Sequence, residues 1–443
     1  MSMPVQIPSM IVARIPDATR RTNLGARATI EGRSTGFWAF LPFVGPAIVA
    51  SVAYMDPGNF VTNLEAGSTY GYQLLWVVLI ANLVAMLFQS MSARLGIVTG
   101  RNLAELCRRE FPRPVAVVMW IGSEIAAIAT DLAEFLGAAL GISLMLHVPL
   151  PYGMGVTGLV TLAILTLQKR GFRPLELVIA ALVSVIGLCY LYELVITQWD
   201  WHAALFHVVV PQLHDRSAGK LAVAIIGATI MPHTLYLHSS LTQDRKLARN
   251  DLERRRLVRG SNQEILVALG FAGLVNLAMV IMAAAAFSRS QPGLSDVGIA
   301  YHALVPALGV GAGAVFLISL TASGISSSVV GTMAGQVIMQ GFVGFGIPVW
   351  LRRVITMAPA FVVGLLCNTA NAMIFSQVVL SLVLPLPMIA LVVLSSRKSI
   401  MGDFVMGRGA GVAAATATVV IVLLNVLLLT ELLLHASPLG VFR

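Results

Sequence analysis

Charged residues are scarce in this sequence, and their scarcity decides the broad class of protein. Only 11% of the 443 residues are Asp, Glu, Lys or Arg, whereas 57% are hydrophobic. Soluble domains average about 25% charged residues. A water-soluble fold is therefore excluded, and the composition predicts an all-α polytopic membrane protein that lies in the lipid bilayer.

The sequence also contains few cysteines and none of the common enzyme motifs. Cys107, Cys189 and Cys367 fit neither a disulfide framework nor a CxxC metal site, so we expect inert cysteines in the core. HExxH, GxSxG and Walker-type motifs are missing, which argues against an enzyme and against a bound cofactor. Arg20 and Arg21 lead into polar sequence rather than an apolar stretch, so we expect no cleavable signal at the N-terminus.

Long apolar runs fill most of the chain. A membrane-spanning helix needs about 20 apolar residues. Runs of roughly that length occur at 39–66, 73–92, 115–146, 152–167, 175–197, 219–243, 264–288, 301–328, 348–367, 371–395 and 410–434. The sequence therefore predicts eleven spans after a tail at residues 1–38.

The net charge of +9 reports topology rather than a nucleic-acid partner. When the loops are assigned to alternate sides, all the basic residues fall on one side except Arg216, Lys220, Arg289 and Arg443. Because Lys and Arg concentrate in cytoplasmic loops, the N-terminus is predicted to be cytoplasmic and the C-terminus outside. We expect the protein in the inner (plasma) membrane of the cell, without a nucleic-acid partner.

The first span contains "SVAYMDPGNFVTN", in which a helix should break. Pro57 removes a backbone donor and disfavours helix at Asp56, and Gly58 supplies flexible backbone. Such a break is tolerated at membrane depth only inside protein or beside a cavity. Kinks are common in membrane helices, but a kink does not explain Asp56, since an ionisable group at this depth is functional by default.

The sixth span contains a second break, in "GATIMPHTLYLHSS" at Pro232. Spans one and six are corresponding members of two five-span halves of opposite orientation, at 39–197 and 198–395, and 396–443 adds the eleventh span. Paired broken helices in such a 5+5 inverted repeat indicate the substrate site of a secondary transporter.

The donors at the two breaks indicate the substrate. Asp56 and Asn59 supply side-chain oxygens, and unwound backbone frees carbonyls near Ala53 and Ala228. These oxygens would suit almost any divalent cation. Met231 narrows the choice, because a thioether favours transition metals over Mg²⁺ and Ca²⁺. Methionine as core filler is the alternative.

These motifs resemble those of the Nramp family (natural resistance-associated macrophage proteins), in its bacterial branch of proton-coupled manganese transporters. "DPGN" and "MPH" are similar to its signature, and "TDLAEFLGAALG", "LQKRG", "YLHSSLTQ", "SGISSSVVGTMAGQVIMQGF" and "IPVWLRRVITM" extend the match over the chain after the tail.

The resemblance implies a leucine-transporter-type fold, with broken helices 1 and 6 and an eleventh span. It implies that Asp56, Asn59 and Met231 bind metal with the carbonyls of Ala53 and Ala228. Gln377 in "FSQVVLS" matches a family glutamine that approaches the metal in some states. The implied substrates are Mn²⁺, and often Fe²⁺ and other divalent metals, imported with H⁺.

Acidic residues of the third span indicate a proton pathway. Glu124, Asp131 and Glu134 are spaced by seven and three residues, which places them on one helical face. The expected partners are Arg352 and Arg353 at the start of span nine, and His233 beside the metal site. A topogenic role for the arginines and a plain hydrogen-bonding role for His233 remain alternatives.

Other function classes stay open at this point. A cation channel would be expected to use rings of charge rather than paired broken helices. An amino-acid carrier of the same fold would face its substrate carboxylate with Gly-rich backbone rather than with Asp and Met. The small residues of "SGISSS" (Ser323–Ser328) predict close helix approach rather than a binding role. The ranking of the metals, the proton stoichiometry and the oligomeric state do not follow from the sequence.

Overall fold

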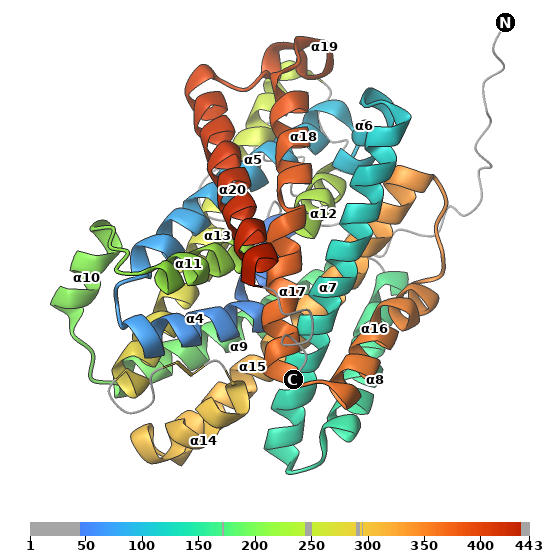
Figure 1. Cartoon of the computed structure of the whole chain (residues 1–443). Coiled ribbons are helices and arrows are strands. Elements are labelled where there is room, and N and C mark those ends of the chain that lie inside the picture. Colours follow the sequence, from blue (N-terminus) through green and yellow to red (C-terminus); the bar gives the residue numbers. More distant parts are fainter. Residues whose placement is uncertain (1–44, 171, 244–249, 289–292, 295, 436–443) are drawn as a thin grey trace, which may run out of the picture.

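The computed structural model describes residues 45–435 except 171, 244–249, 289–292 and 295 (Figure 1). The part of the chain so described contains helices and no strand. The predicted tail at 1–38 and the first six residues of the predicted first span lie outside the described residues.

The first half of the chain forms the helices of the predicted spans one to five. Its helices are α3 Pro46–Val52, α4 Pro57–Tyr70, α5 Leu75–Thr99, α6 Leu103–Glu110, α7 Arg113–Leu146, α8 Leu150–Thr166 and α9 Phe172–Ile196. The short helix α6 lies in the loop between spans two and three, where Asn102 and Glu105 form a capping box at its N-terminus.

The second half forms the helices of the predicted spans six to eleven. Its helices are α10 Trp201–Val209, α11 Arg216–Thr229, α12 Pro232–Gln243, α13 Asp251–Phe287, α14 Val297–Leu308, α15 Val310–Val343, α16 Val349–Leu366, α17 Thr369–Val383, α18 Pro385–Ser396, α19 Lys398–Met401 and α20 Arg408–His435. The helices α10 and α14 are short connections between spans.

Nine helices of the described residues are long and apolar enough to cross a membrane, counting α11–α12 and α17–α18 as one each. The other two predicted spans are the first, which is interrupted, and the fourth, α8, with 17 residues. A helix of this length is about 25 Å long, slightly less than the hydrocarbon core of a bilayer.

The structure corrects two details of the predicted spans. Span eight, predicted at 301–328, is α15 and continues to Val343, while α14 is separate because Gly309 adopts a φ of 96° that interrupts the helix. Span ten is also broken, because Pro385 cannot continue α17 and begins α18.

The two broken spans pack on each other in opposite directions, and Figure 1 shows α4 next to α11. The second half of span one, α4, packs on the first half of span six, α11, and α3 packs on α12. The long helices α7 and α15 pack on each other along this centre. The arrangement therefore brings the two breaks to the same depth.

Candidate functional site

The first span is interrupted at Asp56, as predicted. After α3 a 3-10 turn at Ala53–Met55 follows, and α4 begins at Pro57. Asp56 itself is extended, with φ −76° and ψ 168°, because a proline disfavours helix in the residue before it.

The carboxylate of Asp56 is fully buried and caps α4. It accepts hydrogen bonds from the backbone N–H groups of Asn59 at 3.0 Å and Gly58 at 3.2 Å, and from the Asn59 side-chain Nδ2 at 2.6 Å. A carboxylate at a helix N-terminus is stabilised by the free N–H groups and by the helix dipole. The carboxyl group is therefore held in place by α4 itself.

Side chains of other spans satisfy the backbone of the unwound joint. The carbonyl oxygen of Tyr54 accepts from Asn276 Nδ2 at 2.6 Å, and that of Met55 accepts from Ser323 Oγ at 2.5 Å. Free backbone groups have no water to bind at membrane depth. The joint is thus supported by α13 and α15, which the sequence analysis did not predict.

The sixth span is interrupted between α11 and α12, as predicted at Pro232. Ile230 is extended, with φ −96° and ψ 92°, and Met231 follows it directly before α12. Met231 is fully buried and packs in one cluster with Ala53, Ala126 and Leu380. The structure therefore brings Met231 together with Ala53 of the first break.

The amide of Asn59 connects the two breaks. Its Nδ2 donates to Asp56 Oδ1 at 2.6 Å and to the carbonyl oxygen of Ala228 at 3.1 Å. The hydroxyl of Thr229 donates to Asn59 Oδ1 at 3.4 Å. A single donor atom thus lies between a carboxylate oxygen of span one and a carbonyl oxygen of span six.

Gln377, on α17, lies against Gly58 at the first break. It is fully buried, and its Oε1 accepts no hydrogen bond from the residues that the structure describes. Gly58 is the second residue of α4, and any side chain there would collide with the Gln377 amide. The structure therefore corrects the reason for Gly58: glycine permits this close approach, whereas flexible backbone is not required in a helix.

The site contains donors of mixed type. No group of three or more His, Cys, Asp and Glu side chains is placed to hold a metal within the described ranges. The two breaks offer instead one carboxylate, amide and carbonyl oxygens and one thioether. Oxygen donors suit hard divalent cations, and the thioether adds preference for softer ones.

The acids of the third span are paired with arginines of span nine. Glu124 Oε2 lies 2.6 Å from Arg352 Nη1, and Asp131 Oδ1 pairs with Arg353 Nη1. Arg353 is fully buried. The predicted partners are therefore in contact, and Arg353 does not lie at a solvated span end.

Hydroxyl groups also form hydrogen bonds with the buried pair of Arg353 and Asp131. Ser328 Oγ accepts from Arg353 Nη2 at 2.6 Å and lies 3.1 Å from Asp131 Oδ1, while Thr161 Oγ1 accepts from Arg353 Nη2 at 3.2 Å. Ser328 thus hydrogen-bonds both members of the ion pair, whereas "SGISSS" was predicted to permit close helix approach. Close approach also occurs, because Gly324 lies against Ala138 of α7. The sequence signal for this contact was a run of serines in one span together with a face of acidic residues in another.

Glu134 and His233 are two further buried groups of the predicted proton pathway. Glu134 is fully buried, and neither of its oxygens accepts a hydrogen bond from the part of the chain that the structure describes. His233 Nδ1, on α12, lies 3.2 Å from Thr130 Oγ1 of α7, and its Nε2 has no such partner among those residues.

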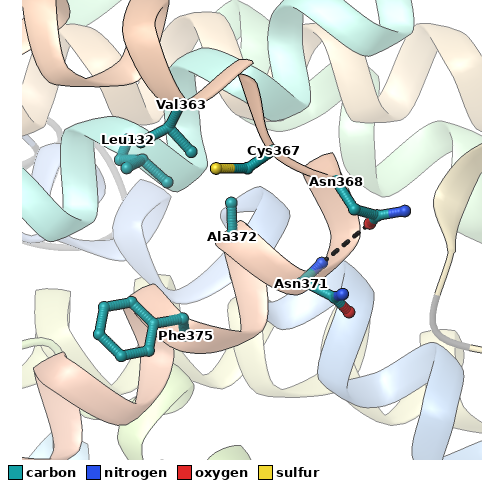
Figure 2. A pocket seen from close by; sticks show the side chains of 7 residues that line it. All are labelled: Leu132, Val363, Cys367, Asn368, Asn371, Ala372 and Phe375. Atoms are coloured by element: carbon teal, nitrogen blue, oxygen red, sulfur yellow. Dashed lines mark hydrogen bonds between the residues drawn. The ribbon is translucent and has the colours of Figure 1, made fainter. Parts of the chain in front are cut away.

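The three cysteines are free thiols, but they do not all lie in the core. Cys107 and Cys189 are buried, as predicted, whereas Cys367 is half-buried. Cys367 lines a cavity of about 230 Å³ between α7, α16 and α17, and Figure 2 shows Leu132, Asn368 and Phe375 among its walls. The exposed lining is almost entirely apolar, and none of the lining residues belongs to the predicted metal site or proton pathway.

The fold and this site define a membrane protein of the leucine-transporter type, with two broken helices around one buried carboxylate. The profile of the family "Natural resistance-associated macrophage protein-like" matches residues 47–431. The chain therefore belongs to this family.

Individual relatives agree with this assignment. A protein of Burkholderia ambifaria named "Divalent metal cation transporter MntH" is 65% identical over 401 residues, which cover 90% of this chain and 91% of that protein. A crystal structure of a mutant of the Eremococcus coleocola manganese transporter is 31% identical, with a TM-score of 0.84, and the match covers 92% of this chain and 90% of that one.

A more distant structure supports the fold alone. Mhp1, a nucleobase-cation-symport-1 family transporter, is 12% identical, with a TM-score of 0.59, and the match covers 90% of this chain and 94% of that one. The relatives are named as transporters, not as enzymes.

Proposed function

We propose that this protein is a secondary transporter of the inner (plasma) membrane that imports divalent transition metals, Mn²⁺ and also Fe²⁺, together with protons. The observation that supports this most strongly is the Asn59 amide nitrogen between Asp56 Oδ1 and the Ala228 carbonyl oxygen, at 2.6 Å and 3.1 Å. A cation held by these two oxygens would lie in the same place.

Metal binding then requires one local rearrangement. The Asn59 amide turns so that Oδ1 rather than Nδ2 faces the ion, and the carboxylate of Asp56 exchanges the Nδ2 donor for the metal. Met231 and the carbonyl of Ala53, which share a cluster, complete the ligand set. Gln377 approaches from α17 beside Gly58.

The hydrogen bonds at the N-terminus of α4 disfavour an amino-acid substrate. Carriers of this fold bind a substrate carboxylate with the free N–H groups at the N-terminus of a broken helix. Here the N–H groups of Gly58 and Asn59 already bind Asp56. A substrate carboxylate would therefore be repelled by the carboxylate of Asp56 and would find these two N–H groups occupied. A cation would be attracted by the same carboxylate.

The paired acids on α7 form the proposed proton pathway. Asp131 with Arg353, and Glu124 with Arg352, extend from the centre of α7 toward its N-terminal end, which the distribution of basic residues predicts to be cytoplasmic. Glu134 and His233 lie nearer the metal site and have ring or carboxylate atoms without a hydrogen-bond partner among the described residues. These groups can exchange protons with Asp56 while the two halves of the fold alternate between inward and outward access.

The test is uptake of Mn²⁺ into proteoliposomes, well below saturation. Asp56→Ala should reduce uptake to the level of empty liposomes, because it removes the carboxylate at the breaks. Asp251→Ala is the matched control, since that carboxylate lies on the exposed start of α13, and it should transport like the wild type. Wild-type uptake by Asp56→Ala would refute the proposed site.

A further inference from the structure

The eleventh span contains one buried amide among apolar residues. Asn425 is 5% exposed, whereas its neighbours Leu423, Val426 and Leu427 are exposed on the outside of α20, where lipid would lie. The helix packs on α18, α11 and α5 (Figure 1). Burying an amide in this setting is unfavourable unless the amide is hydrogen-bonded.

Asn425 makes two reciprocal hydrogen bonds to Ser381 of α17. Ser381 Oγ donates to Asn425 Oδ1 at 2.6 Å, and Asn425 Nδ2 donates to the carbonyl oxygen of Ser381 at 2.5 Å. In an unbroken helix that carbonyl would accept from the N–H four residues later, but this residue is Pro385, which has none. Span eleven therefore satisfies the backbone group that the break in span ten leaves free.

Ser381 lies directly beside the metal site. It is one helical turn after Gln377, and a Cβ at Gly227 would lie 2.7 Å from Ser381 Cβ and 3.2 Å from the Gln377 carbonyl oxygen. The backbone of α11 at Gly227 is thus seated on α17 between these two residues. The next residue is Ala228, whose carbonyl accepts from Asn59.

We propose that Asn425 is a positioning residue for the metal site. It holds the broken span ten at Ser381, so that Gln377 faces Gly58 and the backbone before Ala228 keeps its place. The eleventh span then sets the metal affinity of a site that it does not touch. This inference rests on the proposed function.

The test is Mn²⁺ binding by the purified protein, measured by titration calorimetry, with KM and kcat for uptake in proteoliposomes. Asn425→Leu should raise the Kd and the KM by about threefold to tenfold, the size expected from losing interhelical hydrogen bonds in a membrane. The kcat for uptake should change less, since the variant leaves the proposed proton-pathway residues on α7 unchanged. Thr418→Val is the matched control, because Thr418 lies two turns earlier on α20 and its hydroxyl bonds to the Ala414 carbonyl of its own helix.

A second variant and a double variant make the test decisive. Ser381→Ala removes one of the two hydrogen bonds without adding volume, and should raise the Kd by a smaller factor even if Asn425→Leu fails to fold. In a Gln377→Ala background the effect of Asn425→Leu should shrink, because the two act through one helix. Wild-type Kd in both folded single variants, or the full effect without Gln377, would overturn the inference. If the wild type itself binds no Mn²⁺, the proposed function fails, and the inference fails with it.

Discussion

The buried pair of Arg353 and Asp131 allows a prediction of stability with a defined magnitude. Arg353 is fully buried, bonds to Asp131 and Ser328, and lies 5.7 Å from the ring centroid of Phe135. Removing one partner of a buried ion pair leaves an uncompensated charge and costs about 3–5 kcal/mol. Because Met fills most of the volume of Arg, Arg353→Met should lower the free energy of unfolding by about this amount.

The measurement is equilibrium unfolding in mixed detergent micelles with increasing dodecyl sulfate. Arg254→Met is the matched control, because Arg254 pairs with Asp251 at 2.8 Å on an exposed helix face, and such pairs contribute only about 0.3–0.5 kcal/mol. The double variant Arg353→Met with Asp131→Asn should recover more than half of the loss, since it removes the remaining charge. If Arg353→Met costs no more than the control, or if the double variant is less stable than Arg353→Met alone, the reasoning is wrong.

Three further predictions address the site and the thiols. Met231→Ala leaves an all-oxygen set of donors, so excess Ca²⁺ should compete better with Mn²⁺ uptake than in the wild type; unchanged competition would make Met231 mere filler. Glu134→Gln should weaken acidification of the vesicle interior more than Mn²⁺ binding, and equal acidification would place the proton pathway elsewhere. Burial raises the pKa of the Cys107 thiol in the loop helix α6, so a maleimide in detergent should label the half-buried Cys367 and spare Cys107, as detected by mass spectrometry.

The sequence predicted both breaks because proline has a local and direct effect on backbone. Pro57 and Pro232 cannot continue the helix that precedes them and each begins a new one, and an aspartate at membrane depth is rare enough to stand out. The partners of the acidic face were predictable for a similar reason. Buried charges need opposite charges, and Arg352 and Arg353 stand together at the start of a span, where they could pair with Glu124 and Asp131.

Contacts between distant segments were not predictable in the same way. Asn425 and Ser381 are 44 residues apart, and neither stands out in apolar spans that contain many serines and several asparagines. Ser323 and Ser328 act through their hydroxyls only because α15 lies along α7 and the first break. The orientation of the Asn59 amide depends on the position of the Ala228 carbonyl. That position is set by how the two halves of the fold pack on each other.

One measurement tests proton-coupled metal transport through the two breaks most directly. Mn²⁺ entry and internal pH are recorded together in the same proteoliposomes, for the wild type and for Asp56→Ala. We predict that the wild-type interior acidifies as Mn²⁺ enters, and that Asp56→Ala shows no metal entry. Entry of Mn²⁺ without any change of internal pH, or undiminished entry in Asp56→Ala, would contradict the proposed mechanism.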